Sequence, residues 1–139
     1  MTSDTKEQTP QTNKTKNNNT DVSDMPLVGE KIIVRKFNPK NDRSLFKKWM
    51  DDEFGRCFLL TRTTTRNYSI DELIESKTDI LGMITLPDDT PVGLMAFLDL
   101  DTKQKKAELR KLIGEPEHRG RGFGKEASTL WINYGLKKL

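Results

Sequence analysis

The chain has 139 residues with 24 basic and 21 acidic side chains, which give a formal net charge of +3. The length favours a single domain, and so small a charge does not indicate a protein that binds nucleic acid. The single cysteine excludes an internal disulfide and fits a reducing compartment, and no apolar run is long enough for a signal peptide or a membrane span.

The first 25 residues differ in composition from the rest. They are almost entirely Thr, Asn, Lys, Asp, Gln and Ser. So few apolar side chains cannot offset the entropy of ordering the segment. We therefore predict a disordered polar tail over residues 1–25 and a domain over residues 26–139, in a soluble protein of the cytoplasm.

The first half of the predicted domain contains one strand and two helices. A β-branched centre predicts a strand over residues 30–37. Apolar residues at helical spacing predict a helix over residues 39–52, with Asn38 as its cap. The polar stretch 55–68 is predicted to be a loop. Ser-Ile-Asp-Glu at the start of 69–77 is a capping box that opens a short helix.

Three strands separated by short turns follow, over residues 80–86, 92–100 and 106–114. Short turns join antiparallel neighbours, so a meander is expected. The continuous apolar run of 92–100 indicates burial on both faces. Alternation along 106–114 places Ala107, Leu109, Lys111 and Ile113 on one side and Glu108, Arg110 and Leu112 on the other. The last helix begins near Gly122, and its core stripe is Phe123, Ala127, Leu130, Trp131 and Tyr134.

A glycine turn separates the last strand from the last helix. Gly120, Gly122 and Gly124 alternate with Arg121 and Phe123. Residues without a Cβ let backbone N–H groups approach a bulky anion, and the helix adds the positive end of its dipole. The turn also carries three basic side chains, those of Arg119, Arg121 and Lys125. A pyrophosphate is therefore the expected ligand.

Two well-known phosphate motifs do not match this turn. The dinucleotide fingerprint would need a third glycine where Lys125 stands, and an acidic ribose partner about 20 residues further on. The triphosphate loop would need glycine in place of Arg119 and a hydroxyl residue in place of Glu126.

The pattern R-x-x-G-x-G over residues 119–124 resembles the coenzyme A pyrophosphate loop of the GNAT superfamily of N-acetyltransferases. The surrounding segment, residues 107–127 (AELRKLIGEPEHRGRGFGKEA), is most similar to the branch that acetylates ribosomal-protein N-termini and spermidine. The resemblance covers residues 26–139. It implies an α+β fold with a mostly antiparallel sheet flanked by helices. It also implies acetyl-CoA as co-substrate, and a small-molecule amine or a peptide N-terminus as acceptor. A homodimer is compatible with it.

In the resembled family the chain continues past the helix after the fourth strand. A fifth strand, a further helix bearing a tyrosine general acid and usually two more strands follow. The present sequence ends at Leu139. We therefore expect this copy of the domain to be truncated after that helix.

The resemblance also suggests how acetyl transfer would proceed, by direct attack of the amine in a ternary complex. The backbone of Leu112, Ile113 and Gly114 is expected to polarise the acetyl carbonyl with an N–H group. Glu108 is assigned as the general base, because its offset from Arg119 matches the glutamate of the histone-acetylating branch. The alternative is a strand carboxylate paired with Arg110 or Lys111.

The sequence shows no spacing typical of a metal site and no arrangement typical of an enzyme nucleophile. Two other functions remain open at this stage. One is a non-catalytic relic or interaction module that retains the helices and the sheet. The other, which a single short run favours least, is RNA binding through the Arg-Gly run.

Overall fold

A computed structural model describes residues 24–51, 53–58 and 69–138 of the chain. The strands are β2 (Leu27–Val28), β3 (Ile33–Lys36), β4 (Ile80–Thr85), β5 (Pro91–Asp101) and β6 (Lys106–Ile113). The helices are α1 (Pro39–Trp49), α2 (Glu53–Phe58), α3 (Ile70–Glu75), the 3-10 turn η2 (Pro116–His118) and α4 (Phe123–Lys138).

The described strands form one antiparallel sheet in the order β2-β3-β4-β5-β6, so each strand pairs with its neighbour in sequence. This confirms the predicted α+β class and the meander of the last three strands. The two-residue strand β2 lies before the first predicted strand and is an addition to the prediction. Strand β6 is an edge strand among the described residues.

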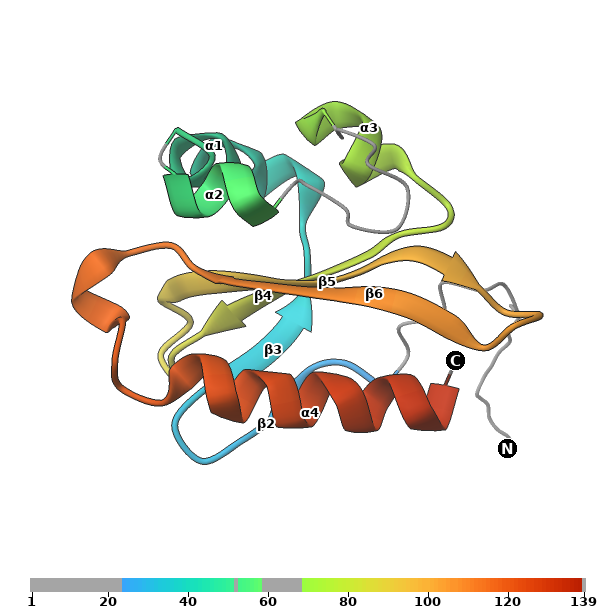
Figure 1. The fold of residues 1–139 in the computed structure, drawn as a ribbon. Coiled ribbons are helices and arrows are strands. Elements are labelled where there is room, and N and C mark those ends of the chain that lie inside the picture. The colour runs from blue at the N-terminus through green and yellow to red at the C-terminus, as the bar shows by residue number, and fades with distance from the viewer. Residues whose placement is uncertain (1–23, 52, 59–68, 139) are drawn as a thin grey trace, which may run out of the picture.

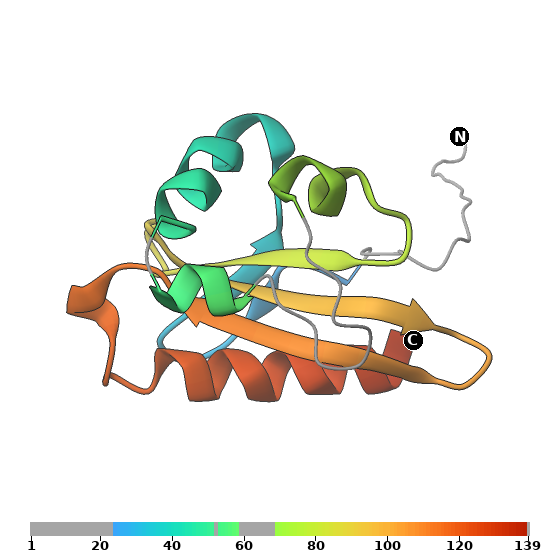
Figure 2. The same cartoon turned by 45° about the horizontal axis from the view of Figure 1, so that its top comes forward.

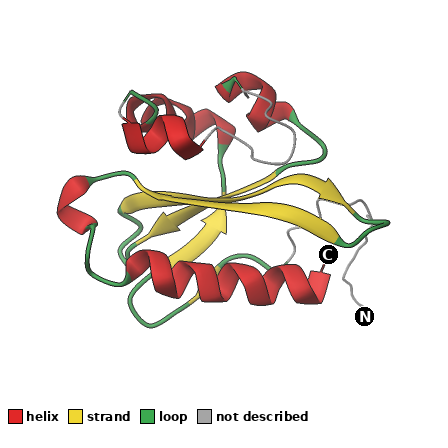
Figure 3. Ribbon diagram, in the orientation of Figure 1, coloured by secondary structure: helices red, strands yellow, loops and turns green. Residues whose placement is uncertain are grey.

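Helices cover both faces of the sheet (Figures 1 and 3). Helices α1, α2 and α3 lie on one face and α4 lies on the other. Apolar side chains from β4 and β5 enter both layers, which confirms the two-sided burial predicted for the third strand. The layer beneath α1–α3 contains Phe46, Trp49, Phe58, Leu94 and Leu112 among its buried residues.

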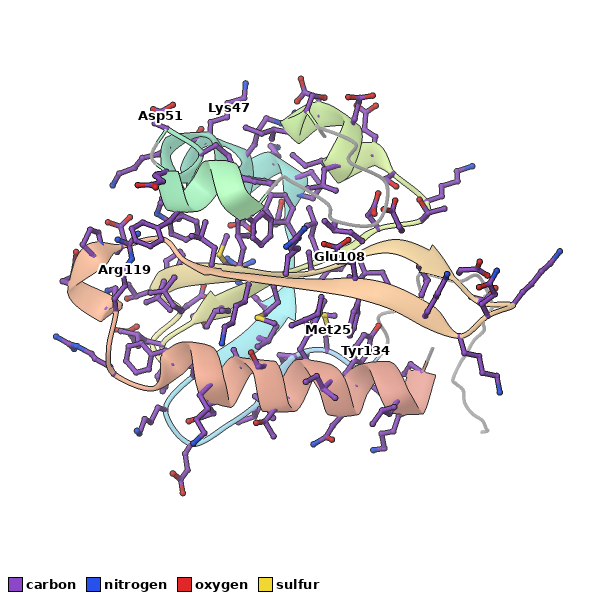
Figure 4. The ribbon with its side chains drawn as sticks, in the orientation of Figure 1. Met25, Lys47, Asp51, Glu108, Arg119 and Tyr134 are labelled. Atoms are coloured by element: carbon purple, nitrogen blue, oxygen red, sulfur yellow. The ribbon has the colours of Figure 1, made fainter. Side chains whose placement is uncertain are left out.

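The second layer is built on α4, whose apolar stripe agrees with the predicted one. Trp131 is fully buried and stacks on Phe97 with ring centroids 5.0 Å apart and on Tyr134 with ring centroids 5.5 Å apart. Figure 4 shows Tyr134 between the helix and the sheet. Among the described residues no helix is both long and apolar enough to cross a membrane.

The predicted helix caps are confirmed. Asn38 accepts hydrogen bonds from the N–H groups of Lys40 and Asn41, and Ser69 forms the full capping box with Glu72. Their helices end at Trp49 and Glu75, slightly before the predicted limits.

The loop predicted over residues 55–68 is wrong at its start, because residues 55–58 belong to α2. Phe58 is buried against α1, at 6.1 Å from the Phe46 ring, so a tertiary contact stabilises a helix too short to show a periodic pattern. The rest of that predicted loop, residues 59–68, lies outside the described residues.

Most of the predicted tail, residues 1–23, also lies outside the described residues. Its last residue, Met25, is half-buried and packs against the layer under α4 (Figure 4). Met25 and Asp24, whose carboxylate lies 3.6 Å from the Lys138 ammonium, thus both contact the described part of the domain.

The aromatic stack of α4 yields a stability prediction. Trp131→Ala should lower the free energy of unfolding by about 3 to 5 kcal/mol, because it leaves a large cavity between two stacked rings. Urea unfolding followed by circular dichroism measures the change. Ile132→Ala is the matched control, since Ile132 is 46% exposed on the same helix, and it should cost less than about 1 kcal/mol. Equal losses in the two variants would contradict the described orientation of α4.

Candidate functional site

The glycine turn lies where the chain leaves the edge strand β6 and passes to the opposite face of the sheet as α4 (Figure 2). Gly120 has a φ of 76° and Gly122 a φ of 82°. Residues with a Cβ rarely adopt these angles, so the glycines are required by the backbone itself. The N–H of Glu126 donates to the carbonyl of Gly122, which makes Gly122 the residue just before the first helical turn.

The space around the glycines fits a phosphate group. A Cβ on Gly120 would meet nothing within 4 Å, and a Cβ on Gly122 would meet only the Lys31 ammonium at 3.6 Å. The first N–H groups of α4 have no helical partner and begin at this open surface. The turn thus offers backbone donors, the positive end of a 16-residue helix and room for an anion.

The basic side chains of the turn have different positions. Arg121 and Lys125 are exposed beside it, whereas the Phe123 ring is buried and contributes only its backbone to the surface. Arg119 is turned back toward β6 (Figure 4). Its guanidinium donates to the carbonyls of Ile113 at 2.9 Å and Gly114 at 3.3 Å, and lies 4.5 Å from the centre of the Phe54 ring. Arg119 therefore fixes the turn to the end of the strand.

The Glu115 carboxylate attaches the segment before the glycine turn to helix α1. Glu115 accepts a hydrogen bond of 2.7 Å from the indole N–H of Trp49 and one of 3.2 Å from the Lys48 ammonium. The indole hydrogen bond is the main cause that holds the pKa of Glu115 below its ordinary value, against the opposing effect of partial burial. Gly114 lies directly on the Trp49 ring, where a Cβ would approach the ring carbons to 2.1 Å.

A pocket of about 500 Å³ runs along β6 toward the turn. It lies between the edge strand and α2, and its lining includes Phe54, Phe58, Leu109, Leu112, Ile113 and Arg119. The lining is mainly apolar. The strand that lines it, β6, has a strand partner on one side only among the described residues.

One backbone donor faces this open edge. The N–H of Gly114 donates to the carbonyl of Val92 at 2.9 Å, so the pair formed by Gly114 and Val92 is hydrogen-bonded. Bonded and non-bonded pairs alternate along an antiparallel ladder, and the next pair, Ile113 with Gly93, is non-bonded. The Ile113 N–H therefore points away from β5 toward the edge. Of the three backbone positions predicted from the sequence, the alternation selects Ile113, since Leu112 and Gly114 direct their N–H groups to β5.

Glu108 lies further along β6, on the side facing α1–α3 (Figure 4). Its carboxylate forms an ion pair with Arg110, and both side chains are mostly buried, at 14% and 16% exposure. This is the ion pair that the sequence analysis gave as the alternative to a catalytic base. The pairing holds the carboxylate in one orientation.

Two cations of the site are absent from the sequence prediction. The ammonium of Lys31 lies beside Gly122, and that of Lys111 lies 3.7 Å from the Cβ position of Gly124. Lys111 could have been found, because the alternation of β6 places it on the side of Ile113 and α4. Lys31 lies 91 residues before Gly122, and no local pattern connects the two positions.

Among the residues that the structure describes, no group of three or more His, Cys, Asp and Glu side chains could hold a metal ion. His118, the only histidine of the chain, lies on η2 with its ring 6.0 Å from that of Phe123. Its Nδ1 atom is buried and has no hydrogen-bond partner within the described part of the chain.

Comparisons with known proteins identify the family. Residues 31–139 match the model of the acetyltransferase (GNAT) domain. An N-acetyltransferase 9-like protein of Nematostella vectensis is 32% identical over 115 residues, covering 82% of this chain and 51% of the relative. An uncharacterized N-acetyltransferase p20 of Bacillus licheniformis is 25% identical over 120 residues, covering 81% and 67%. The chain thus spans about half the length of the first relative and two thirds of the second.

Solved structures show the same fold. The spermidine/spermine N-acetyltransferase SpeG of Vibrio cholerae, solved with manganese ions, has a TM-score of 0.56 at 17% identity over 77% of this chain and 62% of that one. A putative ribosomal-protein-serine acetyltransferase of the same organism has a TM-score of 0.58 at 18% identity over 82% and 68%. At these identities, both likenesses show the fold.

The Glu115 anchor predicts a pH dependence of stability. A carboxyl whose pKa is lowered by folding stabilises the protein above its ordinary pKa of about 4.3, and this contribution is lost as the pH falls through the folded-state pKa. Between pH 6 and pH 3, wild type should lose about 1 kcal/mol more unfolding free energy than Glu115→Gln. Urea unfolding at both pH values measures the difference.

Glu117→Gln provides the control for this comparison. Glu117 is exposed on η2 and makes no hydrogen bond to the indole, so the variant should lose as much stability as wild type. A Glu115→Gln protein whose stability falls just as steeply in acid would show that the indole bond does not hold the carboxylate.

Proposed function

Since the chain belongs to the GNAT acetyltransferase family, we propose that it transfers an acetyl group from acetyl-CoA to a primary amine by direct attack in a ternary complex. The observation that best supports this proposal is that the glycine turn lies next to the apolar pocket beside β6, since the pocket residues Lys111 and Ile113 come within 3.7 Å of the Cβ position of Gly124. A ligand with a pyrophosphate at one end and a long uncharged arm needs both features in that order. Arg119 and Ile113 lie where the two features join.

In this proposal the turn binds the phosphate end. The exposed backbone around Gly120 and Gly122 supplies donors, and the helix dipole of α4 favours the negative charge. Arg119 supports the turn without pointing at the phosphate. Its hydrogen bonds to the carbonyls of Ile113 and Gly114 hold the turn against the edge strand. The apolar pocket then receives the uncharged arm and keeps water away from it.

The bound co-substrate supplies a thioester carbonyl for attack. The outward N–H of Ile113 is the donor in position to polarise that carbonyl, as an edge N–H next to the apolar pocket. A donor held by the sheet needs no reorganisation during the reaction. This assigns to Ile113 the role that the sequence analysis gave to Leu112, Ile113 and Gly114 together.

We assign proton removal from the amine to Glu108, acting through water. An amine is protonated at neutral pH, since an unperturbed primary ammonium has a pKa of about 10.4, and only the neutral form attacks. Arg110 holds the Glu108 carboxylate in place on the face that carries α1–α3. The proton would pass from the ammonium to a water molecule and from there to the carboxylate.

The acceptor is proposed at the level of its chemistry, as a small-molecule amine or a peptide N-terminus. The structural neighbours carry names that refer to spermidine and to a ribosomal protein. Residues 59–68, which follow α2 in the sequence, lie outside the described part of the chain. The described residues do not favour one of these acceptors over the other.

The first test is calorimetric titration with coenzyme A. Gly122→Asn should bind at least about tenfold more weakly, because a side chain enters the space of the anion. Asparagine tolerates a positive φ, so the variant should keep its fold. Lys105→Asn is the matched control, since Lys105 also has a positive φ, 55°, but lies on the β5–β6 turn. Binding that is unchanged in Gly122→Asn would contradict the proposed phosphate site.

The second test concerns the base. Glu108→Gln should lower kcat by about 10²-fold, with the affinity for coenzyme A unchanged, because it removes a proton acceptor and leaves the turn intact. Thiol release across a panel of amines measures the rate. Glu75→Gln, an exposed change at the end of α3, should leave the rate as in wild type.

Two outcomes of this assay would revise the proposal. Full activity in Glu108→Gln would show that another group or bulk water removes the proton. Coenzyme A binding without thiol release for any amine would favour the non-catalytic alternative.

A further inference from the structure

The loop between β2 and β3 reaches the glycine turn from the far end of the sequence. In Figure 1 it passes below the first turn of α4. The Glu126 carboxylate accepts hydrogen bonds from the N–H of Lys31 at 3.0 Å and 3.3 Å and from the N–H of Ile32 at 3.3 Å. Gly29 allows this contact, because a Cβ there would lie 2.0 Å from a carboxylate oxygen.

This contact places the Lys31 side chain at the turn. Its ammonium lies 3.6 Å from the Cβ position of Gly122, on the surface where the backbone is open. Lys31 is exposed, and among the described residues its ammonium forms no ion pair with a carboxylate. A cation in this position is available to an anion bound at the turn.

Lys111 reaches the turn from another element. It extends from the edge strand β6, and its ammonium lies 3.7 Å from the Cβ position of Gly124 in the first turn of α4. It too is exposed, and it also lines the pocket beside β6. The two ammonium groups therefore approach alternate glycines of the same turn, one from the β2–β3 loop and one from the strand.

The contacts of the Glu126 carboxylate explain why an acidic residue in the first turn of α4 is compatible with an anion site. A carboxylate in the first turn of a helix would normally compete with a bound anion for the free N–H groups. Here its oxygens accept from the N–H groups of Lys31 and Ile32 instead. The same hydrogen bonds hold the backbone from which the Lys31 ammonium extends.

We infer that Lys31 and Lys111 are the side-chain cations that bind the pyrophosphate of the coenzyme, and that Glu126 is the residue that positions Lys31. This inference rests on the proposed function. It adds these two lysines to the cations predicted from the sequence, Arg119, Arg121 and Lys125, and among those three Arg119 has its guanidinium bonded to strand carbonyls. An ammonium at hydrogen-bond distance from a phosphate forms a charge-assisted bond.

Calorimetric titrations with coenzyme A and with inorganic pyrophosphate test the two lysines. Lys31→Ala and Lys111→Ala should each weaken binding of both ligands by about tenfold, and Lys31→Arg should restore most of the affinity. The control is Lys47→Ala, because Lys47 points outward from α1 (Figure 4) and should leave both affinities as in wild type. If wild type binds coenzyme A and the two alanine variants bind it with unchanged affinity, this inference is overturned while the proposed function stands.

The two ligands separate this inference from the proposed function. Pyrophosphate binding that depends on the lysines, without binding of coenzyme A, would uphold the cation assignment and contradict the acetyltransferase proposal. Failure of wild type to bind either ligand would overturn both.

Glu126→Ala distinguishes a positioning role from a purely electrostatic one. Removing a negative charge near an anion should strengthen binding if only charge matters. If Glu126 positions Lys31, binding should weaken instead, and the loss should disappear in the Lys31→Ala background. Tighter binding in Glu126→Ala, or the same loss in both backgrounds, would contradict the positioning role. Circular dichroism on each variant checks that α4 has folded.

Discussion

The path of the chain from β6 into α4 is the constraint on which the site depends. Within a few residues the chain leaves the edge of the sheet and begins a helix on the opposite face. Gly120 and Gly122 provide the positive φ angles that this path needs. Trp49 and Arg119 hold the segment between them, through Glu115 on one side and the strand carbonyls on the other. The helix N-terminus is thereby fixed next to the end of an open strand edge.

This arrangement brings three kinds of chemistry together. The turn offers a concentration of positive charge and backbone donors, the pocket offers apolar surface, and the edge offers a donor at Ile113 between them. Each of these three features alone would bind a ligand weakly. Next to one another at the end of β6, they match a ligand that is anionic at one end and uncharged at the other, as the proposed coenzyme is.

Local patterns predicted much of the fold. The alternation of β6 and the stripe of α4 are regular because each element buries one face in a defined layer, and the caps at Asn38 and Ser69 are local hydrogen bonds. Helix α2 escaped prediction because one buried contact of Phe58 stabilises it. The positions of the Lys31 and Arg119 side chains could not be predicted for a similar reason, since each depends on a contact with another element. The motif predicts where an anion would bind, but tertiary contacts decide which side-chain cations lie at that turn.

Backbone amide NMR during a titration with coenzyme A tests the central claim most directly. The account predicts that the largest chemical-shift changes occur at Gly120, Gly122 and Gly124, with a further change at Ile113 on the strand edge. Changes confined to the β5–β6 turn or to α3, with the four amides of the site unmoved, would contradict it.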